Sequence, residues 1–284
     1  DLLGMFDFSN KLPEFDFTLN LAKANLYRLH FDKADTSSAA SMLLTANFKG
    51  NTIDNIDGEI KLLNSNFVKY GNSLELYDFS IKTHKDNGVP VLTLHTDFVD
   101  AEIIGYYNFA ALGNLVKSTV STLMPSGFKV PLQHNNINRN DFSFEIKFKN
   151  TDNINSFFHT GVLLSDKSYI RGAVSQDSII RVEGRAGSLN IRNNIFKDFA
   201  LNINVSRPEL SVDIKSSSLT LLKQSELKDF SVDFRTKPDN FIFSVDWDNK
   251  DEKNNRGNFN ARGNVARNPE TGSSILTINI DSSN

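Results

Sequence analysis

The feature that most constrains this chain is a two-residue alternation of apolar and polar side chains. In the run DFSFEIKFK, apolar residues occupy every second position, and Ser143, Glu145 and Lys147 lie between them. Successive side chains of a β-strand point to opposite faces, so this run predicts a strand that is apolar on one face only. The same alternation recurs in FDFTLNL, LELYDFSI, FIFSVDW and LTINI, with one slip at Tyr77.

Short clusters of turn-forming residues separate these runs, among them KGN, KDNG, SRPE, TKPDN and NPETG. Alternating runs joined by such turns predict a meander of antiparallel strands rather than parallel strands that alternate with helices. The fold class that we expect is therefore all-β: an elongated, twisted, mainly antiparallel sheet with more than half of its residues extended.

One segment departs from the alternation. In NFAALGNLVKSTVSTLMPSG, apolar residues recur every three or four positions and Pro125 and Gly127 close the run, which predicts one amphipathic helix. We expect its apolar stripe either to lie against the apolar face of the sheet as a cap or plug, or to add stability alone. The stripe consists of Leu112, Leu115, Val116, Val120 and Leu123. A shorter helix is predicted in TDNINSFFHTG, with Thr151 as its cap and Gly161 at its end.

One phrase of the chain recurs. KDFALNI begins at Lys197 and KDFSVDF begins at Lys228, and a looser copy, YDFSIKT, begins at Tyr77. Such recurrence predicts stacked units of about 30 residues, each made of strands joined by a turn at Pro208 or Pro238. We expect the Lys-Asp pair to mark a solvated rim or the turn where the strand begins.

These patterns divide the chain into three parts. We predict a β segment at 1–106, the amphipathic helix at 107–125, and a second β segment at 126–284 that contains two clear repeats at 188–214 and 218–245. The chain begins without Met and ends within an alternating run, so we expect it to be an interior stretch of a longer protein.

The aromatic content suggests what the apolar face is for. The chain has 23 Phe but only 6 Tyr and 1 Trp, so this face has few hydroxyl or indole N–H groups. A closed β-sandwich that buries these rings is one interpretation. An open apolar groove that shields acyl chains is the other, and alternation predicts that one face carries its lining. The predicted lining residues are Phe142, Phe144, Ile146, Phe148, Phe199, Leu201, Ile203, Phe230, Val232, Phe234, Phe241 and Phe243.

Other chemistry is poorly represented. The net charge of −3 gives no basic surface for nucleic acid or for an anionic membrane. There is no Cys, and the five His are dispersed, so we expect no cofactor and no metal. DNIDGE at 54–59 lacks the first ligand of a calcium loop and predicts a hairpin turn, and the loop at 247–255 reads as solvated. Catalytic motifs are also missing, and we do not expect an enzyme.

Three phrases resemble the TamB branch of the AsmA-like superfamily, especially its Bacteroidota forms. They are the glycine turn from Phe48 to Ile60, the phrase from Thr96 to Gly105, and the phrase from Ser168 to Gly172, within a resemblance that covers most of residues 10–265. The resemblance implies a β-groove, or β-taco, in the periplasm of a diderm bacterium. It further implies a bridge-like lipid transfer protein that carries phospholipid between the membranes, is anchored in the inner membrane, and works near an outer-membrane barrel partner.

Two other functions remain as alternatives. The same family has been proposed to act as a translocation and assembly module, a scaffold or chaperone that presents strand edges to outer-membrane barrel proteins. The other alternative is a closed β-sandwich adhesin or glycan-binding module, which would expose Trp or Tyr platforms. The single Trp, Trp247, alternates with Phe243 and Val245 on the apolar side, so we rank this function last.

Overall fold

The computed structural model describes residues 1–128, 140–175, 179–222, 224–250 and 255–281. Within this part the chain forms 17 strands and two helices, and 65% of the residues are in strands. The all-β class and the predicted extended majority are therefore confirmed. The two-residue alternation sets this outcome, because only extended backbone puts every second side chain on one face.

The chain divides into two units that we describe separately. Unit 1 comprises residues 1–105 and 145–167, and unit 2 comprises residues 106–144 and 168–284. Unit 1 breaks off after residue 105, next to the boundary expected at 106, and resumes with the segment 145–167, which belongs with the first strands. Within unit 1, Lys149 makes this connection: its N–H donates to Phe98 O, and its ammonium donates to Thr96 O and Asp100 Oδ1. The three-part division expected from the sequence stays a prediction.

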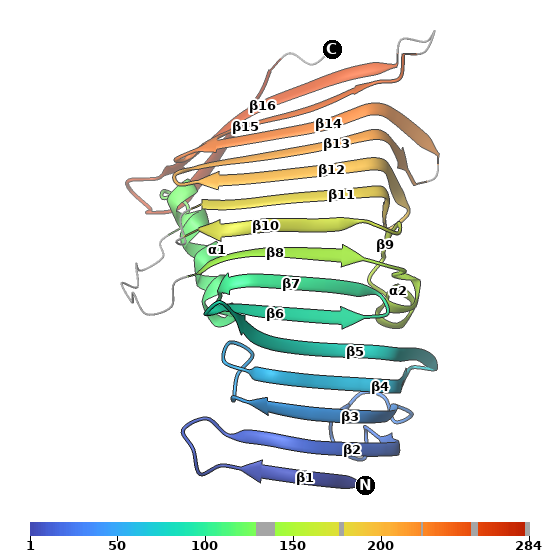
Figure 1. Ribbon diagram of the computed structural model, residues 1–284. Helices are drawn as coiled ribbons and strands as arrows, with labels where there is room; N and C mark the ends of the chain where they lie inside the picture. The colour runs from blue at the N-terminus through green and yellow to red at the C-terminus, as the bar shows by residue number, and fades with distance from the viewer. Residues whose placement is uncertain (129–139, 176–178, 223, 251–254, 282–284) are drawn as a thin grey trace. The chain divides into compact units, whose positions relative to one another are not determined.

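Unit 1 is an antiparallel meander in which each of the first seven strands pairs with the next (Figure 1). Helix α2, Asp152–Phe158, packs against β5. The strands are β1 (Leu2–Asp7), β2 (Glu14–Asn25), β3 (Ala39–Lys49), β4 (Asp57–Lys69), β5 (Asn72–Asp86), β6 (Val89–Thr96), β7 (Val99–Tyr106) and β9 (Val162–Leu164).

Unit 2 is a second antiparallel meander, in which each strand from β10 to β17 pairs with the next. Strand β8, Asp141–Phe148, has its first four residues in unit 2 and its last four in unit 1. The other strands are β10 (Tyr169–Ser175), β11 (Ile179–Ile191), β12 (Asn194–Ser206), β13 (Glu209–Leu221), β14 (Ser225–Lys237), β15 (Asn240–Asp248), β16 (Arg256–Arg267) and β17 (Ser274–Ile280).

Helix α1, Phe109–Leu123, forms where the sequence predicts it. The side chain of Asn108 caps it by accepting a hydrogen bond from Ala111 N at 2.7 Å. Its partners in unit 2 are turns at the strand ends. Arg207, after β12, donates to Ser118 Oγ and Thr119 Oγ1 at 3.0 and 2.9 Å.

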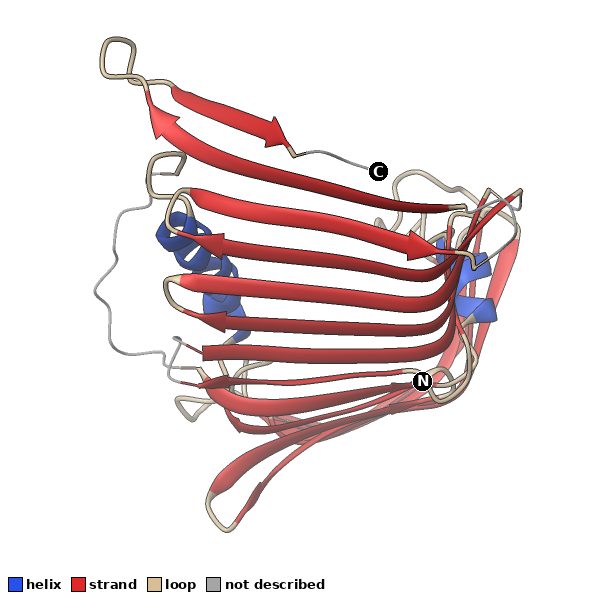
Figure 2. Ribbon diagram, turned by 90° about the horizontal axis from the view of Figure 1, so that it is seen from above, coloured by secondary structure: helices blue, strands red, loops and turns tan. Residues whose placement is uncertain are grey.

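The end of α1 is tied to the next turn in the same way. Asp239, between β14 and β15, donates its N–H to Leu123 O and accepts from Ser126 N and Oγ, each at 2.8 Å. In Figure 2 this longer helix lies beside the strand ends. Polar groups of the turns therefore hold α1 at the ends of the strands, and the role of its apolar stripe as a cap or plug, or in stability alone, stays a prediction.

The apolar stripe of α1 is narrower than expected. Leu115 and Leu123 are buried, and Leu112 and Val120 are half-buried. Val116 is 60% exposed, so its predicted place in the stripe is wrong. Arg207 explains part of the difference, because it binds Thr119, which is buried and occupies the helix face between Leu115 and Leu123.

The shorter helix, α2, is also present, although its ends differ from the expectation. Thr151 is its N-cap residue but makes no capping bond, and its hydroxyl instead accepts from Leu164 N at 3.2 Å. The left-handed residue that ends the helix is His159 rather than Gly161. DNIDGE forms part of the turn into β4, as predicted.

Candidate functional site

One face of the unit 2 sheet is apolar. Directly paired residues of antiparallel strands share a face, and the pairs Leu201–Ile214, Ile214–Val232 and Val232–Val245 carry this face across four strands. No charged side chain occupies a paired position on it. This surface, the unit 2 apolar face, consists of Ile170, Gly172, Val174, Ile180, Val182, Gly184, Ala186, Phe199, Leu201, Ile203, Val205, Leu210, Val212, Ile214, Ser216, Phe230, Val232, Phe234, Thr236, Phe241, Phe243, Val245, Trp247, Gly257, Phe259, Ala261, Gly263, Val265, Leu276, Ile278 and Ile280.

The structure places eight of the twelve predicted lining residues on this face, in β12, β14 and β15. Two more belong to β8 and lie beside it: the Phe144 ring lies over Gly172 of this face, and the centre of the Phe142 ring lies 6.3 Å from that of the Phe144 ring. Ile146 and Phe148 lie in the part of β8 that belongs to unit 1. Their relation to the unit 2 apolar face therefore stays a prediction.

The opposite face of unit 2 carries the charges. Arg171 and Arg185 donate to the carboxylate of Glu183, and Arg235 donates to Asp213 at 2.8 Å. The Arg171 guanidinium, followed by Arg185 and the Tyr169 hydroxyl, lowers the pKa of the Glu183 carboxyl to about 2. The strong division between the two faces follows from the alternation in the sequence.

Glycines on the apolar face make room for aromatic rings of the neighbouring strand. A Cβ at Gly263 would lie 2.1 Å from the Phe241 ring, and a Cβ at Gly257 would lie 2.1 Å from the Trp247 ring. Each ring therefore lies over bare backbone, an arrangement known to support glycines within sheets. The alternation predicted where Trp247 points but did not predict these contacts.

The recurring phrase interrupts the ladder inside its strand. Asp198 and Asp229 have φ values of 49° and 44°, in the left-handed region, and pairing skips each of them. Because alternation slips there, residues three apart share a side: the Phe196 ring lies 5.6 Å from Phe199 and 6.2 Å from Phe230. In Figure 1, β12 and β14 turn sharply toward the end that carries these residues.

This location corrects the expectation that the Lys-Asp pair marks a rim or turn. The phrase lies at the fourth and fifth residues of β12 and of β14. Hydroxyl groups of β13 bind the first copy of the phrase, because Ser216 Oγ donates to the backbone oxygen of Lys197 at 2.6 Å and Ser217 Oγ donates to the Asp198 carboxylate at 2.7 Å. The phrase therefore marks a bend in the sheet.

Unit 1 has an apolar face of the same kind. The pairs Phe15–Phe48, Leu44–Leu62 and Ile81–Leu94 lie on it, and its paired positions carry no charge. This surface, the unit 1 apolar face, consists of Leu2, Gly4, Phe6, Phe15, Phe17, Leu19, Leu21, Met42, Leu44, Ala46, Phe48, Gly58, Ile60, Leu62, Phe79, Ile81, Thr83, Leu92, Leu94, Thr96, Ala101 and Ile103.

The aromatic side chains of both units remain accessible. All 23 Phe lie in the described part of the chain, and Phe142 is the one that is buried. Phe is among the residues most often fully buried in globular proteins, since burying its ring is worth about 1.5–3 kcal/mol. Rings that stay partly exposed on the strands of both units therefore indicate surfaces made to contact something apolar.

A cavity of about 620 Å³ opens beside strands β4 and β5 of unit 1. Phe67, Leu74, Leu76 and Phe79 of β4 and β5 form its floor. Helix α2 contributes one wall, and the loop at 26–38 contributes the other. We call this cavity the unit 1 chamber. The sequence predicted α2 but not the chamber, because the loop at 26–38 has no periodicity.

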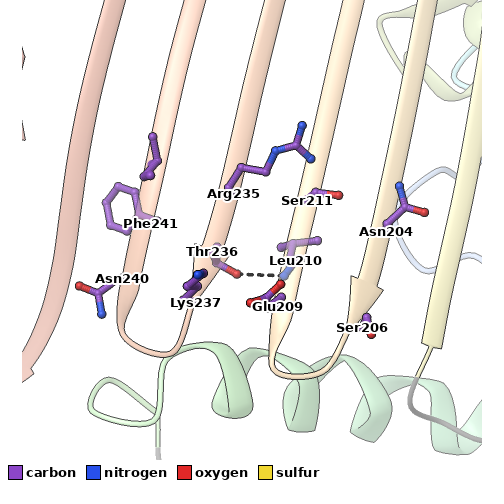
Figure 3. A pocket seen from close by; sticks show the side chains of 11 residues that line it. Asn204, Ser206, Glu209, Leu210, Ser211, Arg235, Thr236, Lys237, Asn240 and Phe241 are labelled. Carbon is purple, nitrogen blue, oxygen red and sulfur yellow. Dashed lines mark hydrogen bonds between the residues drawn. The ribbon is translucent and has the colours of Figure 1, made fainter.

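A smaller cavity of about 480 Å³ lies at the turn end of β12 to β15 in unit 2 (Figure 3). Its lining mixes polar side chains such as Asn204 and Arg235 with Phe241. Thr236 is buried there and accepts a hydrogen bond from Leu210 N at 3.2 Å. Polar residues outnumber apolar ones in its lining, but apolar atoms form most of its exposed surface.

Other kinds of site find little support in the described residues. No three His, Asp or Glu side chains of that part of the chain group together to hold a metal ion. Neither described helix is long and apolar enough to cross a membrane. Lys250 pairs with Asp229, and residues 251–254 of the loop discussed above lie outside the described residues.

Comparison with known proteins does not identify a family for this chain. No family model, no curated protein and no solved structure matches this chain. The family therefore stays a prediction from the three sequence phrases.

Proposed function

We propose that this chain is a segment of a bridge-like lipid transfer protein, in which each apolar face shields phospholipid acyl chains. The observation that carries the proposal is the exposure of Phe: every Phe that belongs to the two apolar faces as defined above stays partly accessible. Shielding a sixteen-carbon chain from water is worth about 12 kcal/mol, at roughly 0.8 kcal/mol per CH₂. An uncharged face suits this role, since a desolvated charge beside the chain would cost several kcal/mol.

The bends supply the second part of the proposal. A sheet that bends along a line of left-handed residues forms a trough, and we infer that its apolar face lines that trough as a groove. The repeated phrases then have one structural role, because each places another bent strand, with its apolar side chains, beside the preceding one. Because the rings of Trp247 and Phe241 lie over Gly257 and Gly263, they project little from the sheet and keep the apolar surface smooth.

The cellular setting rests on the TamB-like phrases. They favour a periplasmic location in the envelope of a diderm bacterium, an inner-membrane anchor in the full-length protein, and an outer-membrane barrel partner. A closed-sandwich adhesin fits less well, because its inner-face Phe would be buried.

A second candidate function is a scaffold for outer-membrane barrel proteins. Strand β17 favours it, because this strand is exposed along its whole length and carries accessible Ile275, Leu276, Ile278 and Ile280. Such a strand can recruit an extended client by β-augmentation. A client peptide that binds through β17 would leave the binding of phospholipid to the unit 2 apolar face unchanged.

Native mass spectrometry of the purified chain tests the proposal. We expect phospholipid to accompany the wild-type chain and less of it to accompany Phe234→Glu, which puts a charge on the unit 2 apolar face and leaves the unit 1 apolar face unchanged. Asn204→Glu is the matched control, because Asn204 lies on the polar face opposite Ser211. If both variants and the wild-type chain carry equal lipid, or none carries any, the proposal fails.

A further inference from the structure

The unit 1 chamber has features that an open apolar face does not need. Its floor residues Leu74 and Leu76 are buried, whereas Phe31 and Phe158 on opposite walls are 81% and 61% exposed. The chamber therefore has buried apolar residues in its floor and accessible aromatic rings in its walls. Its volume lies within the range of small-molecule sites, and its side walls would hold one chain rather than a layer of chains.

One of the residues that line this chamber, Ser38, has a buried hydroxyl. Ser38 is 1% exposed, and its Oγ has no hydrogen-bond partner among the described residues. A buried hydroxyl without a partner costs free energy, which an acceptor oxygen on a bound ligand would recover. A carbonyl oxygen is such an acceptor.

Charged groups of the chamber gather on the loop and at the end of β4. Lys69 pairs with Asp32 at 3.1 Å, and Lys33, which is exposed, has no ion pair among the described residues. The remaining chamber residues carry no charge. These cations can receive a carboxylate or a phosphate while the chain lies against the rings.

Hydrogen bonds stabilise the loop at 26–38 that forms one wall of the chamber. The carboxylate of Asp35 accepts from Ser37 N and Oγ at 2.9 and 2.6 Å, and from Tyr70 N at 2.5 Å, which ties the loop to the turn between β4 and β5. Leu26 N donates to Ser38 O and closes the loop at its base. The chamber is therefore preformed, which lowers the entropy lost on binding.

We propose that the unit 1 chamber binds one single-chain acyl compound whose carbonyl oxygen accepts a hydrogen bond from Ser38. A free fatty acid and a lysophospholipid share this chemistry. The chamber adjoins the unit 1 apolar face and shares Phe79 with it, whereas its other lining residues lie outside the faces proposed above to carry phospholipid.

Binding of three twelve-carbon ligands to the full chain tests the proposal: dodecanoate, the dodecanoyl lysophosphatidylcholine, and dodecylphosphocholine, which has no carbonyl. Calorimetry below the micelle concentration should show one equivalent bound. Ser38→Ala should weaken the two carbonyl ligands about fivefold and leave dodecylphosphocholine unchanged. Equal effects on all three ligands, or none on any, would overturn the role of Ser38. Binding of dodecanoate alone or of the lysophospholipid alone would identify the source of the chain.

The chamber itself is tested by filling it. Ala34 lines the chamber and is exposed, so Ala34→Trp should remove binding of all three ligands without overpacking the sheet. Ala266→Trp, at an exposed position of β16 in unit 2, is the matched control. Wild-type binding by Ala34→Trp would overturn the proposal. Phe234→Glu should leave the chamber equivalent intact, so loss of phospholipid from the unit 2 face is distinguishable from loss of the chamber ligand.

Discussion

The strands β4 to β6 of unit 1 and β13 to β15 of unit 2 form the same kind of bend by different means. In both, a strand contains the four-residue motif Leu-x-Asp-Phe, where x is any residue. The motif runs from Leu76 to Phe79 in β5 and from Leu227 to Phe230 in β14. In both, the following strand ends at the bend. The side chain of the next residue, Asp97 or Asn249, accepts the N–H of Tyr77 or Lys228, at 2.6 and 2.7 Å.

The two bends differ in where the left-handed residue lies. In unit 2 it is Asp229 of the phrase itself, whereas in unit 1 it is Asn64 on the neighbouring strand β4, opposite Tyr77. The surroundings differ as well. In unit 1, α2 and the loop at 26–38 stand over the bend and form the chamber, and in unit 2 the rings of Phe196, Phe199 and Phe230 fill the corresponding place. The phrase therefore marks a bend in each unit, and the residues that lie over the bend determine whether a cavity forms there.

The largest expected effect compares two glycines. A Cβ at Gly58 of unit 1 would lie 2.2 Å from Asn47 O, and its φ of +136° suits glycine alone. We expect Gly58→Ala to lower the free energy of unfolding by about 3 kcal/mol, because backbone cannot move aside.

In unit 2, the three atoms nearest to a Cβ at Gly263 all belong to the ring of Phe241, and because a side chain can move aside where backbone cannot, Gly263→Ala should cost below about 1 kcal/mol. Urea denaturation of both variants measures the difference. Equal losses would show that the Phe241 ring is as fixed as the backbone, as in a closed core.

A smaller effect separates the two bends. Asp229→Val forces a β-branched residue into the left-handed region and should cost about 1–2 kcal/mol, while Asp229→Gly should cost little. In unit 1 the sensitive position is Asn64, so Asn64→Val should behave like Asp229→Val. Asp78→Val, at the position that matches Asp229 in sequence, should stay within about 0.5 kcal/mol. Urea unfolding of the four variants checks this pattern, and a costly Asp78→Val would contradict it.

How much of this was predictable varies with the range of the interactions involved. Alternation sufficed for the strands, for the division between apolar and charged faces, and for α1, because each depends on neighbours in sequence. The slip at Tyr77 was visible, but its cause lies in Asn64 on another strand. The contact of Phe241 with Gly263, and the walls of the chamber, depend on residues far apart in the chain, and no local period reports them.

The smallest expected effect concerns acid. The pKa of Glu183 in unit 2 lies at about 2 in the folded chain, below its value of roughly 4.3 in an unfolded chain. Its contribution to stability is therefore present above about pH 4.3 and is lost as the pH falls toward 2. Thermal melts between pH 2 and pH 5 should fall less steeply for Glu183→Gln than for the wild-type chain. Parallel curves would show that the arginines do not favour the charged carboxylate.

The most direct test of the central claim uses the fluorescence of Trp247. This residue is the single Trp of the chain, lies on the unit 2 apolar face over Gly257, and is half-buried. Phospholipids brominated on their acyl chains quench an indole that they contact. We predict that loading the chain with brominated phospholipid quenches Trp247 strongly relative to the same lipid without bromine. Equal emission with the two lipids, at equal measured loading, would contradict the claim that acyl chains lie on this face.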